Sequence, residues 1–79
     1  MLKFKPTKGR VYWYVTDFWE VFYPISVTFD GKCYKWHLGD GLYERFYDYE
    51  ISPRRLFRKK KPAARAAAKL NKGVKAICD

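Results

Sequence analysis

The 79-residue sequence has few of the residues that bind metals or carry redox chemistry, with two cysteines and one histidine. Cys33 and Cys78 lie far apart and match no metal or redox spacing, so we expect free thiols rather than the alternative disulfide. His37 falls on the polar side of a strand pattern, where we expect no chemistry. The acids are scattered and form no pair suited to acid–base catalysis, and no nucleophile–base arrangement is present. We therefore expect no metal, no cofactor and no enzymatic activity.

Long apolar runs are also missing from the sequence. No stretch approaches the roughly 18 residues that a membrane-spanning helix needs. The N-terminal residues MLKFKPTKG have no apolar core of the kind found in secretory signal peptides. These two features predict a soluble cytoplasmic protein with no membrane partner.

Acidic residues are nearly absent from the C-terminal part of the chain. Residues 1–50 carry seven basic and seven acidic residues, whereas residues 51–79 carry ten basic residues and one acid. The whole net charge of +9 therefore lies in the last part of the chain. Such asymmetry favours a localised anionic partner over a general effect on solubility.

Aromatic residues are abundant, with six Phe, seven Tyr and three Trp. Large rings bury much area per residue, so a short chain can still form an adequate core. We expect a single domain over residues 1–79. Its expected parts are a neutral β-rich body (1–53), a basic loop (54–61), a C-terminal helix (62–72) and a tail (73–79).

Several segments have the residue pattern of β-strands. Residues 11–15, VYWYV, are β-branched or aromatic throughout, and residues 42–49 are rich in aromatic rings. Residues 16–20 between strands predict a loop or a hairpin tip, and Pro24 predicts an irregularity or an edge position. The expected fold is mainly β (α+β): a small antiparallel SH3-like barrel or curled sheet of four to five strands, with one C-terminal α-helix.

One hairpin is specified in more detail. Residues 25–29 alternate apolar and polar side chains, and Asp30-Gly31 is a favoured two-residue turn before residues 32–37. This turn would pair Phe29 with Lys32 and Val27 with Tyr34. The side chains then expected on the apolar face are Ile25, Val27, Tyr34 and Trp36, and those on the polar face are Ser26, Thr28, Cys33, Lys35 and His37.

The last element is predicted to be a helix over residues 62–72. Pro62 suits a first helical turn, and Gly73 suits a C-terminal cap. One helical stripe is apolar and comprises Ala63, Ala66, Ala67 and Leu70. A second stripe on a different face is basic and comprises Arg65, Lys69 and Lys72.

The opening Gly9-Arg-Val-Tyr-Trp13 and the closing Leu-Phe pair with its alanine-rich helix resemble small SH3-like barrel proteins of phages and Gram-positive bacteria. The matching residues at the close are Leu56, Phe57, Arg58, Ala63, Ala66, Ala67 and Leu70. The resemblance covers about residues 8–72, and it implies the fold and a phage or mobile-element setting, with no catalytic residue. Lys59, Lys60 and Lys61 stand where such chains have a threonine cap and acids opening the helix. The departure is unfavourable, because a helix N-terminus carries partial positive charge.

The basic segment before the helix is the first candidate site. A phosphate group there would offset the adverse charge and use the free N–H groups of the first turn. Nucleic acid, an acidic protein surface and a solvated loop without a specific partner are the three alternatives. The candidate residues are Arg54, Arg55, Arg58, Lys59, Lys60 and Lys61, extended along the helix by Arg65, Lys69 and Lys72.

Aromatic side chains interleaved with basic residues are the second candidate site. Exposed rings beside cations can stack on the bases of a single strand, and they suit a protein interface equally well. The rings expected to be exposed are Trp13, Trp19, Tyr47 and Tyr49.

The function predicted from the sequence is a non-enzymatic module that binds DNA or RNA through its phosphate backbone. The alternative is a phage or mobile-element protein that binds and inhibits a host or defence protein in the host cytoplasm, as an anti-CRISPR-like inhibitor would. The sequence does not choose between DNA and RNA or set the oligomeric state, for which a dimer through an unpaired edge strand is one option.

Overall fold

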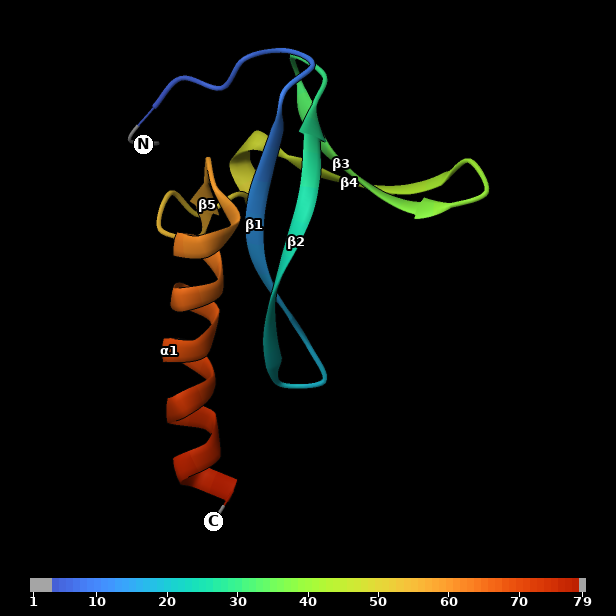
Figure 1. Cartoon of the computed structure of the whole chain (residues 1–79). Helices are drawn as coiled ribbons and strands as arrows, with labels where there is room; N and C mark the ends of the chain where they lie inside the picture. Colours follow the sequence, from blue (N-terminus) through green and yellow to red (C-terminus); the bar gives the residue numbers. More distant parts are fainter. Residues whose placement is uncertain (1–3, 79) are drawn as a thin grey trace.

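The computed structural model describes residues 4–78, with side chains for residues 4–72. Its strands form one antiparallel, unclosed sheet in the order β4-β3-β2-β1-β5, and a single C-terminal helix packs on it (Figure 1). The expected fold class is confirmed. Of the two forms that the sequence predicted, a barrel or a curled sheet, the structure has the sheet, because β4 and β5 lie at opposite edges and do not close it. In chain order the elements are β1 (Val11–Phe18), β2 (Val21–Phe29), β3 (Cys33–Gly39), β4 (Leu42–Tyr47), the 3₁₀ turn η1 (Asp48–Glu50), β5 (Leu56–Phe57) and α1 (Lys60–Cys78).

Strands β1 and β2 form a hairpin that is paired along its full length, from Val11↔Thr28 to Phe18↔Val21. The predicted hairpin tip is confirmed, but β1 continues through residues 16–18, which were expected in the loop. Trp19 and Glu20 form the turn with φ of 53° and 68°. Positive φ at both central residues matches the twist of paired strands, although side chains other than glycine adopt it at a cost of about 1 kcal/mol each.

The turn between β2 and β3 differs from the predicted one. The expected pairing of Phe29 with Lys32 is wrong, because Phe29 pairs with Tyr34 instead. The carboxylate of Asp30 accepts hydrogen bonds from the backbone N–H groups of Lys32 and Cys33, both at 2.8 Å, and so closes a longer loop. These bonds, led by the one from Cys33, hold the pKa of Asp30 well below its usual range.

The register shift is two residues, so it leaves each side chain on its predicted face. Ile25, Val27 and Tyr34 are buried as expected, and Trp36 packs against them. Cys33 is the exception on the polar face: it is buried, with a free thiol whose pKa is raised by burial. The side chain of Cys78 lies outside the described residues.

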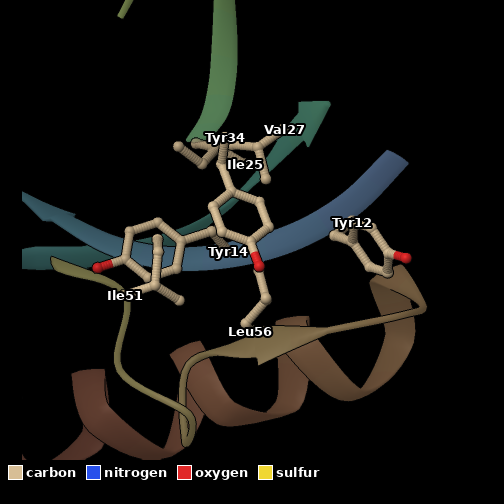
Figure 2. Packing of buried hydrophobic residues seen from close by; sticks show 7 residues of the cluster. All are labelled: Tyr12, Tyr14, Ile25, Val27, Tyr34, Ile51 and Leu56. Atoms are coloured by element: carbon tan, nitrogen blue, oxygen red, sulfur yellow. The ribbon is translucent and has the colours of Figure 1, made fainter. Parts of the chain in front are cut away.

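The first core lies on the face of the sheet that carries the tyrosines of β1. Figure 2 shows its buried side chains converging from β1, β2, β3 and the segment around β5. Rings contact each other directly there: the centroids of Tyr12 and Tyr34 are 6.4 Å apart in an edge-to-face arrangement. The members of this core are Tyr12, Tyr14, Ile25, Val27, Tyr34, Ile51 and Leu56.

The second core lies on the opposite face of the sheet, beneath α1. Val15 is fully buried against Ala63 and Ala67, and Trp13 and Phe57 pack around them. The apolar helix stripe is thereby confirmed at its first members, whereas Leu70 is exposed.

No helix in the described part of the chain is both long and apolar enough to cross a membrane.

The helix is longer than predicted. It begins at Lys60 and runs to Cys78, where the sequence predicted a helix over residues 62–72 that Gly73 would end. Figure 1 shows α1 running beside β1 and β2 and extending beyond their turn. Gly73 therefore continues the helix, which a glycine tolerates at a cost of about 1 kcal/mol relative to alanine.

Tyr34 carries a buried hydroxyl that has no hydrogen-bond partner among the described residues. Burial raises the pKa of Tyr34 to about 12. An unpaired buried hydroxyl costs roughly 1–3 kcal/mol. We expect Tyr34→Phe to raise the free energy of unfolding by about 1 kcal/mol at pH 7, as measured by urea denaturation.

Alkaline pH should widen the difference in stability between Tyr34→Phe and the wild type. Because the folded protein holds the Tyr34 proton more tightly than the unfolded chain does, stability from this group is complete below about pH 10 and is lost as the pH rises towards 12. Tyr34→Phe should therefore lose less stability than the wild type over that interval. Tyr12→Phe is the matched control: the Tyr12 hydroxyl accepts a hydrogen bond of 2.7 Å from the N–H of Thr7, so its removal should destabilise the protein. Equal destabilisation by Tyr34→Phe and Tyr12→Phe would contradict the conclusion that the Tyr34 hydroxyl has no hydrogen-bond partner.

Candidate functional site

The basic segment is held in place by β5, the two-residue strand at the edge of the sheet. The backbone N–H of Val15 donates to the carbonyl of Arg55 at 2.8 Å, and Trp13 and Tyr14 pair with Phe57 and Leu56. Alternation along the strand sends Leu56 into the first core and Phe57 towards the second. The predicted Leu-Phe anchor is confirmed, and it positions the cations on either side of β5.

A pocket with a volume of about 520 Å³ opens beside this anchor. Among the described residues, three cations line it, Arg54, Arg58 and Lys59, and no acid does. This volume is within the range of small-molecule sites, roughly 300–1,000 Å³. The remaining lining residues are apolar: Phe4, Pro53, Leu56, Phe57 and Pro62.

Arg58 forms part of the pocket wall through an aromatic contact. Its guanidinium carbon lies 4.7 Å from the ring centroid of Phe4, and that ring stacks on Tyr12 with centroids 5.3 Å apart. The segment before β1 therefore orients one of the predicted site residues. Phe4 was not among the predicted site residues, since no local pattern indicates that the N-terminal segment lies against residues 53–62.

A second, smaller hollow of about 300 Å³ adjoins the same cations. Arg58 and Lys59 line both hollows, and Arg10 adds a third cation to the second one. A continuous line of positive charge thus runs from Arg54 past Arg58 and Lys59 to Arg10. Arg10 was also missed by the sequence prediction, although its place in a basic N-terminal segment is a weak indication.

The other predicted cations lie along α1. The first turn of the helix contains no acid, and Lys60 places its amino nitrogen 5.5 Å from the ring centroid of Trp13. The outer side of the helix, opposite the buried Ala63 and Ala67, is basic and exposed, as predicted for its second stripe. Its cations are Lys61, Arg65, Lys69 and Lys72.

These cations are not neutralised within the described chain. Among the side chains of residues 4–72, the only salt bridge joins Lys35 to Asp30 at 3.6 Å. That pair lies in the neutral body, far along the sheet from β5. The positive potential along the cations from Arg54 to Arg10 can therefore attract an external anion.

Four of the predicted site residues belong neither to the pocket nor to the basic side of α1. Arg55 is half-buried with its guanidinium 5.0 Å from the ring centroid of Phe22. The prediction that Trp13 is exposed is wrong, because its ring is half-buried against the second core beneath α1. Trp19 is 96% exposed at the β1–β2 turn, and Tyr47 is exposed on β4, the edge strand farthest from β5.

The exposure predicted for Trp19, Tyr47 and Tyr49 is confirmed, and the last two stack with ring centroids 5.8 Å apart. They lie away from the line of cations that runs from Arg54 to Arg10.

Comparison with protein-family models, with curated proteins and with solved structures found no match.

Proposed function

We propose that the protein binds nucleic acid through contacts to the phosphate backbone. The observation that carries this proposal is the line of cations without described acidic partners beside β5, continued by the basic outer face of α1. The remaining body is neutral, so the attraction is directed to one surface. The phosphate-binding residues proposed are Arg54, Arg58, Lys59, Lys61, Arg65, Lys69 and Lys72, with Lys60 and Arg10 beside them.

The mechanism is charge neutralisation. Each cation that meets a phosphate releases condensed counterions, so binding weakens as salt rises, and it depends little on base sequence. Arginine can hold a phosphate oxygen with two N–H donors, whereas lysine contributes a point charge. Arg54 and Arg58 are accordingly proposed as the positioning contacts, and the lysines as the long-range attraction.

Fluorescence anisotropy with a labelled DNA or RNA oligonucleotide at two salt concentrations tests this proposal. We expect the double variant Arg58→Glu/Lys59→Glu to lose at least about tenfold in affinity at low salt and to show a shallower salt dependence. Lys32→Glu/Arg45→Glu is the matched control, because it makes the same change of net charge on the exposed neutral body. It should change affinity by no more than about threefold.

Two outcomes would overturn the proposal: absence of binding at low salt, or equal losses from the two double variants. The prediction of an inhibitor that docks on a host or defence protein stays open to the same experiment. An inhibitor would show little affinity for naked nucleic acid, and a pull-down after nuclease treatment would still recover one stoichiometric protein partner.

A further inference from the structure

The pocket beside β5 has a floor that phosphate binding does not need. Five of the eight described residues that line it are apolar, and two of these are phenylalanines. Phosphate oxygens gain nothing from Leu56, Phe57 or Phe4, since they form hydrogen bonds and ion pairs. A ligand that uses the whole pocket must combine a negative charge with a flat apolar part.

We propose that this pocket accepts an unpaired base of single-stranded nucleic acid, an inference that rests on the proposed function. The base would lie against Phe4 and the half-buried Phe57, with the buried Leu56 beneath them. The phosphates on either side of it would lie on Arg54, Arg58 and Lys59. Stacking of bases on aromatic rings within a basic groove is the usual physical basis of single-strand binding, and it tolerates any base because each has a π face.

The contact between Arg58 and Phe4 suits both halves of such a ligand. Its guanidinium is 4.7 Å from the ring centroid, so the planar group already forms part of an aromatic wall. The N–H donors of a guanidinium stay available at its edge while its face is stacked. Arg58 can therefore contact a base and hold a neighbouring phosphate at the same time.

The second hollow extends the path of a strand out of the pocket. It shares Arg58 and Lys59 with the first hollow and adds Arg10, and no acid lines it in the part of the chain that the structure describes. A polymer with one charge per unit fits a line of cations of this kind. A duplex does not fit the pocket, because its bases are paired and stacked inside the helix.

The test compares three oligonucleotide probes with matched numbers of phosphates: an oligothymidylate of about twelve nucleotides, its abasic counterpart and a duplex. We expect the oligothymidylate to bind about tenfold more tightly than the abasic strand, which keeps every phosphate but has no base to stack. Phe4→Ala should reduce that ratio towards one. The variant also removes the ring that holds Arg58, so the ratio of the two affinities is the measured quantity and not the abasic affinity alone. Tyr49→Ala is the control, since it removes an exposed ring away from the pocket.

A second measurement does not depend on any variant. The methyl resonances of Leu56 should shift when the oligothymidylate binds, through the ring current of the base, and should not shift with the abasic strand. The buried methyl groups of Val27 serve as the reference. Equal affinity for the thymidylate and abasic strands, or unmoved Leu56 resonances at saturation, would overturn the base pocket while leaving phosphate binding intact. Failure of all three probes to bind would instead overturn the proposed function, and competition by an acidic peptide alone would assign the pocket to a protein partner.

Discussion

Replacement of Ala67 by glutamate is expected to destabilise the protein by more than about 3 kcal/mol. Ala67 is 3% exposed in the core between α1 and the sheet, where Val15 and Ala63 are fully buried. A glutamate there has to bury a carboxylate without a partner or push the helix off the sheet. In a chain of 79 residues, whose total stability is small, either outcome removes most of the folded population.

Ala68→Glu is the matched control for this prediction. Ala68 is exposed on the same helix, so the variant makes the same change of charge and of helix propensity without entering the core. We expect it to alter the free energy of unfolding by less than about 0.5 kcal/mol. Urea denaturation followed by circular dichroism measures both variants, and similar stability of the two would show that α1 does not pack on Val15.

Replacement of Asn71 by alanine is expected to destabilise the protein by about 2 kcal/mol. The Asn71 side chain forms two hydrogen bonds with the backbone of Phe22 in β2. The N–H of Phe22 donates to Oδ1 at 2.6 Å, and Nδ2 donates to the carbonyl of Phe22 at 2.9 Å. The amide thus takes the place of a neighbouring strand where β2 has none, since β3 pairs with β2 at Thr28 and Phe29. Its removal leaves a half-buried donor and acceptor without partners.

Two further variants separate this contact from a general effect on the helix. Asn71→Asp keeps the acceptor for the Phe22 N–H but sets a carboxylate oxygen against the Phe22 carbonyl in place of the donor, so it should also destabilise the protein at neutral pH. Lys72→Ala changes the adjacent exposed residue and should have little effect. An Asn71→Ala variant as stable as Lys72→Ala would contradict the edge contact.

The strands and their buried faces were predicted from local sequence patterns, and these patterns predicted much of the fold. Alternation in residues 25–29 identified Ile25 and Val27 as core residues, and both are buried. Pro24 indicated an edge, and it lies in the part of β2 that has no strand on its outer side. The position of Leu56 and Phe57 before an alanine-rich helix predicted their anchoring role. Each of these inferences needed only near neighbours in the chain.

The candidate site was predicted in part. The excess of cations after residue 50 identified Arg54, Arg58 and Lys59, which the structure places around one pocket. Arg55 has the same composition signal, but β5 directs it to Phe22 instead. Trp13 was expected at the surface because a strand pattern does not say which of its faces a later helix will cover.

The sequence by itself determined the class of fold, the neutral body, the basic C-terminal part and the stripe by which the helix packs, because charge, side-chain alternation and helical period are local properties. The tertiary structure alone decided the contact of Asn71 with Phe22, the pairing of Phe29 with Tyr34 and the apolar floor beneath the cations. Each of these depends on which distant segments meet or on how a side chain closes a loop. The free energy of such contacts appears only once the chain has folded, so no local pattern records it.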